Sequence, residues 1–146
     1  RRTERVAMKH KRFIFMLMVI FVLGLWLHWS SIEKGERLAV NNCGGCHDLS
    51  AKKENKRGPF LWGIVTRRIG IADGFEYSEA LRQFADSRPF SWSEVNLDML
   101  ITDPDKLKPG TRMAERESDS KHSKAFKNMK NLDNRKELIV FLKTLN

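Results

Sequence analysis

The sequence Cys43-Gly44-Gly45-Cys46-His47 is the most informative stretch of this 146-residue chain. Its two cysteines are the only ones in the sequence, and two residues separate them. A single pair of cysteines this close together cannot form the disulfide framework of a small secreted scaffold. A structural zinc site would need a second pair of ligands, and the chain has no further cysteine to supply it. We therefore expect the motif to hold a cofactor.

A cysteine pair followed directly by histidine is the pattern by which c-type haem is attached to a chain. On a helical turn both sulfurs face the two vinyl groups of the porphyrin, and the adjoining histidine lies under the iron. A thioredoxin-like dithiol is the competing interpretation, but that fold places a strand before the motif and does not need His47. The motif favours haem c attached through Cys43 and Cys46, with His47 as an iron ligand.

An apolar segment, FIFMLMVIFVLGLWLHW, occupies residues 13–29 and carries no formal charge. As a helix it spans about 25 Å at about 1.5 Å per residue, a little less than the roughly 30 Å of a bilayer's hydrocarbon core. Cleavage after Ser30 or Ser31 would need a small residue where the chain has His28 or Trp29. We therefore expect an uncleaved transmembrane anchor, with a cleaved signal sequence as the alternative.

Much of the positive charge precedes this segment. The whole chain has 27 Lys plus Arg and 18 Asp plus Glu, a formal charge of +9, and residues 1–12 account for +5 of it. Basic flanks stay in the cytoplasm, so we expect the rest of the chain on the periplasmic side of a bacterial inner membrane. Met8 followed by KHKRF fits a conventional start, which leaves residues 1–7 open to being a mis-called upstream extension.

The remainder of the chain predicts short helices joined by loops. Ser78 and Ser93 are suited to cap the helices expected over residues 77–84 and 93–101. A further helix is expected over residues 33–42, and the last should begin at a capping Asp133 or Asn134. The last helix has one apolar face, because its apolar residues recur at helical spacing: Leu138, Phe141, Leu142 and Leu145.

These observations predict an all-α protein with four segments. Residues 1–12 form a basic cytoplasmic N-terminus, residues 13–29 form the anchor, residues 30–33 form a short linker, and residues 34–146 form the cofactor domain.

Five motifs after the cysteines, in the right order, resemble the class I cytochrome c family in its mitochondrial-like branch. They are GPFLWG at residues 58–63, RRIG at 67–70, GFEYSEA at 74–80, FSW ending at Trp92, and KPGTRM ending at Met113. The resemblance extends from about Gly35 to Leu145. It implies the class I cytochrome c fold with one covalently bound haem c, and a close crossing of the first and last helices at Gly35 and Phe141.

The resemblance also implies roles for individual residues. Met113 would be the second axial ligand, and Met/His ligation raises the potential, as is general for cytochromes c. The backbone carbonyl of Pro59 would accept the Nδ1 proton of His47. Four residues would hydrogen-bond or neutralise the haem propionates: Arg67, Tyr77, Trp92 and Thr111.

Two departures from the family pattern concern the surroundings of Met113. Leu81 and Leu100 stand where the family usually has an Asn and a Tyr, so we expect a drier distal side. The connection after Met113 is roughly twice the usual length, and its His122 and Met129 are alternative ligands.

With both axial positions filled there is no open site for a substrate, so the expected activity is electron transfer and not catalysis. The family's partners are a cytochrome bc1 complex as donor and a haem-copper cytochrome c oxidase as acceptor; no nucleic acid and no small-molecule substrate is expected. Basic residues near the haem edge would form the docking surface: Lys52, Lys53, Lys56, Arg57, Lys106, Lys108, Arg112 and Arg116.

Two alternative functions stay open at this point. One is a fixed haem c subunit of an oxidase or dehydrogenase complex. The other is a haem-based peroxidase or gas sensor in which Met113 leaves the iron. The linker of about four residues would reach about 14 Å when extended, so a carrier of this kind is expected to work close to the membrane, either by small rotations between neighbouring partners or held within a supercomplex.

Overall fold

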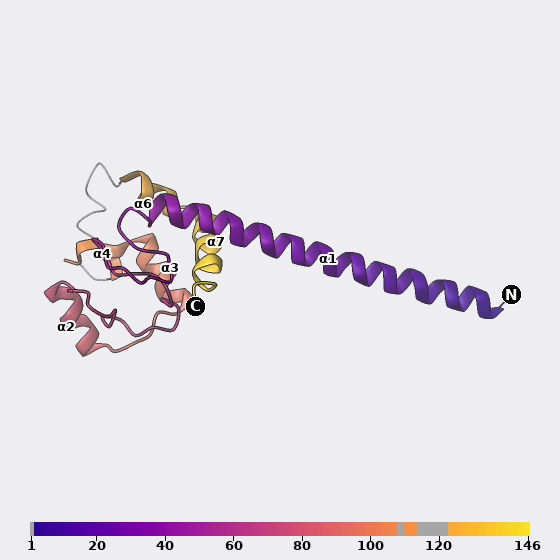
Figure 1. The fold of residues 1–146 in the computed structure, drawn as a ribbon, viewed down its shortest axis with the longest axis horizontal. Helices are drawn as coiled ribbons and strands as arrows, with labels where there is room; N and C mark the ends of the chain where they lie inside the picture. The colour runs from indigo at the N-terminus through magenta and orange to yellow at the C-terminus, as the bar shows by residue number, and fades with distance from the viewer. Residues whose placement is uncertain (1, 108–109, 114–122) are drawn as a thin grey trace. The chain divides into compact units, whose positions relative to one another are not determined.

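The structure is a computed structural model that describes residues 2–107, 110–113 and 123–146 (Figure 1). Its regular structure is helical, and no β-strand occurs in these ranges. The prediction of an all-α fold is therefore confirmed for this part of the chain. The chain divides into two compact units, Arg1–Ser31 and Ile32–Asn146, which are described separately here.

Helix α1 spans Arg2–Asn42 and contributes to both units. Residues 30–33, which we predicted to be a linker, are helical. This corrects the expected break, and the reason is local: no proline or glycine lies between Gly24 and Gly35. The Ser30 hydroxyl also donates to the Leu27 carbonyl at 2.9 Å, so its polar group is satisfied within the helix.

The first unit consists of α1 alone, and its apolar side chains over residues 13–29 are exposed. By length and composition α1 could cross a membrane, although a signal sequence near an N-terminus meets the same criteria. A continuous exposed apolar surface of this kind needs a partner or a lipid environment.

In the second unit the short helices begin close to the predicted positions. Helix α2 spans Glu79–Ser87 and α3 spans Glu94–Thr102. The predicted serine caps are confirmed, because the Oγ atoms of Ser78 and Ser93 accept hydrogen bonds from Leu81 N and Asn96 N.

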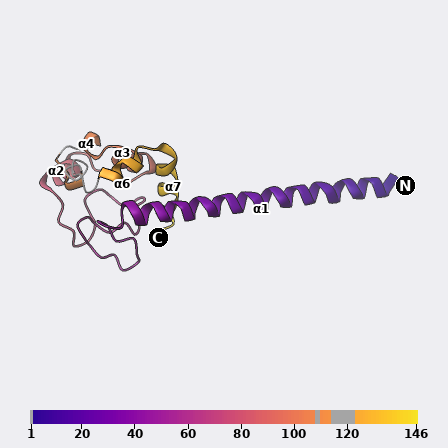
Figure 2. The same cartoon turned by 90° about the horizontal axis from the view of Figure 1, so that it is seen from above.

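In the C-terminal half of this unit, the described residues include helices α4 at Pro104–Leu107, α6 at Ser123–Met129 and α7 at Leu132–Leu142. Helix α3 contacts all three, and α6 also contacts α7. In both views α2 lies on the other side of this unit from α7 (Figures 1 and 2). We did not predict α6, whose residues we had assigned to the long connection.

Helix α7 begins one to two residues earlier than predicted. The side chain of Asn131, and not that of Asp133 or Asn134, caps it by accepting from Asn134 N at 3.0 Å. Asn131 has the extended backbone that a cap residue needs, whereas the next residues are already helical.

The close crossing of α1 and α7 at Gly35 is present in the structure. A Cβ atom at Gly35 would overlap Glu137 O and lie 2.7 Å from the Phe141 Cβ. Ala39, one turn later on α1, is fully buried. Two small residues on one face of α1 therefore allow the two helices to approach each other closely.

Long loops between α1 and α3 surround the remaining side of the core. The backbone of Trp92 is held by two hydrogen bonds: its N–H donates to Arg67 O, and its carbonyl accepts from Thr66 N. Its ring packs edge-on against the ring of Phe90, with 5.4 Å between the ring centroids, and the Phe90 ring packs in turn against Phe84 of α2. These contacts connect α2 to the core.

Candidate cofactor site

A cavity of about 210 Å³ lies inside the second unit. Its walls come from the end of α1, the loops that follow, α2, α3, the segment 111–113, α6 and α7. Every residue that the sequence analysis assigned to the cofactor lines it: Cys43, Cys46, His47, Pro59, Arg67, Tyr77, Trp92, Thr111 and Met113. Residues far apart in the sequence thus meet around one space.

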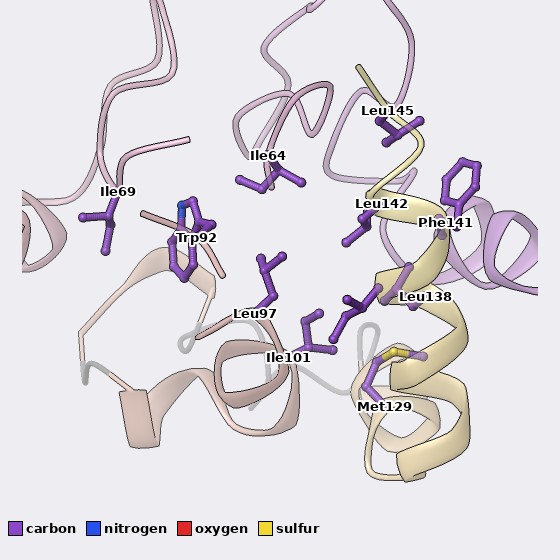
Figure 3. Close-up of a cluster of buried hydrophobic side chains, with 12 residues drawn as sticks. Ile64, Ile69, Trp92, Leu97, Ile101, Met129, Leu138, Phe141, Leu142 and Leu145 are labelled. Atoms are coloured by element: carbon purple, nitrogen blue, oxygen red, sulfur yellow. The ribbon is translucent and has the colours of Figure 1, made fainter. Parts of the chain in front are cut away.

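Most of the cavity wall is apolar. Figure 3 shows Ile64, Trp92, Leu97 and Leu142 arranged around one common space, with Leu138 and Met129 beside it. Leu81 and Leu100, the two departures from the family pattern, also line the cavity. Such a wall excludes water and suits a large apolar ring.

The two cysteines lie on a turn that continues from α1. Cys43 N and Gly44 N both donate to Ala39 O, and Cys46 N and His47 N both donate to Cys43 O. This winding brings both thiols to the cavity wall.

The pKa of the Cys43 thiol and the element before it bear on whether the motif attaches haem or is a thioredoxin-like dithiol. Burial raises the pKa of Cys43 to about 12, and the neighbouring Cys46 adds to the shift. A reactive dithiol needs a lowered thiol pKa, and the element before Cys43 is a helix and not a strand. Both observations disfavour the thioredoxin-like alternative. No group of three or more metal-binding side chains from His, Cys, Asp and Glu occurs in the described ranges.

The ring of His47 is held in one orientation. Its Nδ1 lies 2.6 Å from Pro59 O, and a carbonyl can only accept, so the proton is on Nδ1. Burial lowers the pKa of His47 against the opposing effect of this hydrogen bond, and the nearby Arg67 and Lys56 cations lower it further. A neutral ring protonated on Nδ1 has its Nε2 lone pair available to a metal.

Gly58 makes this orientation sterically possible. A Cβ atom there would overlap the His47 Cε1 atom and lie 2.7 Å from its Nδ1. The Gly58 N–H also donates to Cys46 O at 2.8 Å. In the GP pair at residues 58–59, Gly58 therefore packs against the ring and the Pro59 carbonyl accepts a hydrogen bond from its Nδ1–H.

Hydrogen-bond donors gather along another part of the wall. The Arg67 guanidinium donates to Phe60 O at 2.7 Å and to Trp62 O at 3.3 Å, and burial lowers its pKa. Tyr77 Oη accepts from Ala72 N at 3.1 Å, which leaves its own proton available to another acceptor. Burial raises the pKa of Tyr77 and keeps the hydroxyl protonated.

Trp92 supplies a further donor. It is 7% exposed, and its indole N–H has no protein acceptor in the described part of the chain. A cation and two donors beside an apolar cavity fit a ligand that is mainly apolar but carries carboxylates, as haem does. The residues present therefore fit haem c.

The cavity lining also contains two thioethers, those of Met113 and Met129. Met113 is half-buried and follows Thr111, which is 5% exposed, while Arg112 donates to Glu76 O at 2.9 Å. Met129, the alternative ligand, is 4% exposed and also lines the cavity. The other alternative, His122, lies outside the described residues.

Our sequence analysis missed part of this wall. Ala125 and Phe126 of α6 line the cavity together with Met129. The available signal was the helical spacing of Phe126 and Met129, three residues apart, within the polar sequence SKAFKNM. We had treated Met129 only as a substitute ligand and not as part of a helix.

Of the basic residues expected around the haem edge, Arg57 and Arg112 line the cavity and are exposed. Lys56 is exposed and donates to Gly44 O at 3.2 Å. Lys52 and Lys53 are exposed in the loop after His47. The predictions for Lys108, Arg116 and the side chain of Lys106 fall outside what the structure describes.

The chain is similar to proteins named cytochrome c. The protein of Gibberella zeae is 31% identical over 112 residues, which cover 77% of this chain and 92% of the relative. That of Arabidopsis thaliana is 33% identical over 110 residues, 75% of this chain and 85% of the relative. Cytochrome c-550 of Novispirillum itersonii is 35% identical over 115 residues, 77% of this chain and 96% of the relative. No protein-family profile matches the chain.

Proposed function

Because this chain belongs to the class I cytochrome c family, we propose that it is a membrane-anchored one-electron carrier of a respiratory chain. Members of the family are electron-transfer proteins and not enzymes, and they bind one covalent haem c. The observation that supports the proposal most directly is the meeting of the CGGCH turn, Met113 and the donor residues around one apolar cavity.

In this proposal Cys43 and Cys46 would hold the haem through thioethers, and His47 and Met113 would ligate its iron. The haem supplies a reversible change between ferric and ferrous iron. With His47 and Met113 both bound to the iron, no position would be left for a substrate. The carbonyl of Pro59 orients His47, and the donors around Arg67 neutralise the propionates.

The apolar wall has a separate part in the proposed activity. By excluding water, it limits the rearrangement of solvent that accompanies each change of charge, and it favours the less charged ferrous state. Leu81 and Leu100 extend this wall, so the potential depends more on packing than on a polar network.

We propose that residues 13–29 anchor the protein in a bacterial inner membrane, with residues 1–12 in the cytoplasm. The domain from residue 34 onward would then face the periplasm. The exposed apolar side chains of α1 and the basic segment before them support this arrangement.

The proposed partners are a cytochrome bc1 complex and a cytochrome c oxidase. Arg57 and Arg112 bring exposed positive charge to the cavity lining, and Lys56 lies beside the CGGCH turn. Acidic partner surfaces would be attracted to this region, which speeds encounter and weakens with salt.

The assignment of ligands is tested with two methionine variants. We expect Met113→Ala to keep covalent haem, because both cysteines are intact, but to lower the potential and admit external ligands. Met129→Leu is the matched control, since it conserves apolar volume in the same wall, and it should keep a six-coordinate low-spin spectrum. If Met129→Leu loses this spectrum and Met113→Ala keeps it, Met129 is the ligand.

The proposed role is tested in native membranes. Quinol should reduce the haem of this chain through the bc1 complex, and the oxidase should reoxidise it within one catalytic cycle. Haem that is reduced but not reoxidised would contradict the role. Carbon monoxide binding to the reduced wild-type protein at neutral pH would instead support the sensor or peroxidase alternative.

A further inference from the structure

Arg135 of α7 is a buried cation that does not line the cavity. Its side chain is 9% exposed. Its Nε donates to Asp98 Oδ1 at 2.7 Å, and its Nη1 donates to Met129 O at 2.9 Å and to Lys130 O at 3.0 Å. One guanidinium therefore connects α3, the end of α6 and α7.

The two carbonyls that Arg135 binds are at a helix end. The last carbonyls of a helix have no partner within the helix, and α6 ends at Met129. Asn134, the neighbour of Arg135, donates from Nδ2 to Asn128 O at 3.1 Å. Two consecutive residues of α7 thus bind three consecutive carbonyls at the end of α6.

Helix α6 depends on such external contacts. It has seven residues, and helices this short are not stable by themselves in water. Its other end follows residues outside the described part of the chain. A side-chain contact joins it to α1, where Asn128 Nδ2 donates to Asn42 Oδ1 at 3.0 Å, immediately before Cys43.

The same short helix covers part of the candidate haem cavity. Phe126 and Met129 line the cavity, and Met129 is almost fully buried. The carbonyl of Met129 is bound by Arg135 while its side chain faces the cavity. A shift of the α6 end would therefore move the wall directly.

We propose that Arg135 is a positioning residue for electron transfer. Through the carbonyls of Met129 and Lys130 it holds α6 against the haem, so that water and external ligands are kept away from the iron. This inference rests on the proposed function and deepens it. Asp98 orients the guanidinium, but the contacts to the two carbonyls carry the effect.

Because Asp98 only orients Arg135, whereas the two carbonyl contacts hold α6, the proposal predicts an order of effects among variants. Arg135→Met removes all three contacts while keeping apolar length. Arg135→Lys keeps the charge, but an ammonium lacks the planar fork of donors and cannot reproduce all three contacts. Asp98→Asn leaves both carbonyl contacts possible. Exposure of the iron should rise most in Arg135→Met, less in Arg135→Lys and least in Asp98→Asn.

Two controls separate positioning from general effects. Arg82→Met removes a surface pair of similar geometry, since Arg82 Nη2 lies 2.6 Å from Glu79 Oε2. Leu145→Ala weakens the core at a buried residue that does not line the cavity. The first control reports the loss of an ion pair, and the second reports a loss of stability.

The experiment uses the full-length haem-loaded protein in detergent, with added imidazole as the external ligand. We expect Arg135→Met to bind imidazole at least about tenfold more tightly than the wild type, which corresponds to about 1.4 kcal/mol. Its reduction potential should fall, and amide hydrogen exchange over residues 125–130 should quicken. Arg82→Met should match the wild type in all three measurements.

The proposal would be overturned if Arg135→Met and Leu145→Ala, compared under conditions where they are equally stable, bind imidazole with equal affinity. Destabilisation alone would then explain the effect. An Asp98→Asn effect as large as that of Arg135→Met would also overturn it. If Arg135→Met does not fold, Arg135→Lys and Asp98→Asn are compared under the same criteria. Failure of the proposed function would be recognised independently, by the absence of a reversible one-electron change in the wild type.

Discussion

Gly58 and Gly45 differ in their surroundings although both belong to the segment that holds His47. A Cβ atom at Gly58 would overlap the His47 ring, whereas one at Gly45 would meet nothing within 4 Å. We expect Gly58→Ala to displace the ring, lower the yield of covalent haem and destabilise the protein by about 1–3 kcal/mol, as overpacking does.

Gly45→Ala is the matched control, since it lies within CGGCH and has room for a methyl group. Its haem content, low-spin spectrum and unfolding midpoint should stay close to those of the wild type. Equal losses in both variants would show that the contact between residue 58 and the ring is unimportant.

Tyr77 predicts a pH dependence of stability. Burial raises its pKa above the ordinary value of about 10. The folded protein therefore retains the proton over a pH range where the unfolded chain loses it. The stabilising contribution is complete below the ordinary pKa and is lost as the pH rises through the folded value.

We expect the free energy of unfolding to fall above about pH 10, and Tyr77→Phe to reduce this fall. The measurement is denaturant unfolding at several alkaline pH values. Tyr77 is the only tyrosine in the chain, so its ionisation can be followed directly by ultraviolet absorbance. An unchanged pH profile in Tyr77→Phe would assign the alkaline loss of stability to other groups.

Helix α1 carries two glycines with opposite surroundings. At Gly35 an added Cβ would overlap the Glu137 carbonyl of α7, whereas at Gly24 it would meet nothing within 4 Å. Alanine normally stabilises a helix relative to glycine by about 1 kcal/mol. At Gly35 the overlap with backbone should outweigh this gain, and we expect a net loss of about 1–3 kcal/mol.

Gly24→Ala tests the same substitution in the same helix without the crossing. It should leave the unfolding midpoint of the haem domain unchanged, because Gly24 lies in the other unit. A Gly35→Ala variant as stable as the wild type would mean that α1 and α7 can separate without loss.

The limits of sequence analysis are clearest at the level of these elements. Ser78 and Ser93 were recognisable as helix caps because a serine directly before a helical segment commonly accepts a hydrogen bond from a free N–H of the first turn. Helix α6 was not recognisable, since it has too few apolar residues to produce a strong period. It is stabilised by Asn42, Asn134 and Arg135, and such tertiary contacts cannot be deduced from local sequence.

The residues that line the cavity could be predicted more fully than the helices, because the resemblance to the family supplies them as motifs in a fixed order. Within a short stretch of chain, CGGCH supplies the turn with both cysteines and the His47 ring, and the GP pair at residues 58–59 supplies the carbonyl that accepts a hydrogen bond from this ring. The wall formed by Phe126 and Met129 could not be located in the same way, because its distance from Met113 in the sequence departs from the family pattern.

At the scale of the whole molecule, only residues 30–33 separate the predicted anchor from the haem domain. Even fully extended, four residues reach only about 14 Å. We therefore propose a carrier that works by small rotations between neighbouring partners or is held within a supercomplex. This proposal predicts that added reach should be harmful.

A twenty-residue Gly/Ser linker inserted after Ser31 tests this proposal. Such a linker has a root-mean-square length of about 25 Å, from about 5–6 Å multiplied by the square root of its residue number. It lowers the effective concentration of the haem domain near adjacent partners. We expect unchanged haem content and lower quinol-driven oxidase turnover in native membranes.

The same linker inserted after His10 is the control, because it lengthens the chain before the apolar segment, keeps Lys11 and Arg12 next to that segment, and leaves the tether to the haem domain unaltered. Turnover in this control should equal that of the wild type, so any loss specific to the Ser31 insertion reflects the position of the haem domain. A clear rise in turnover after the Ser31 insertion would mean that reach had been limiting. The protein would then act as a tethered shuttle between distant complexes, and not as a fixed relay between neighbours.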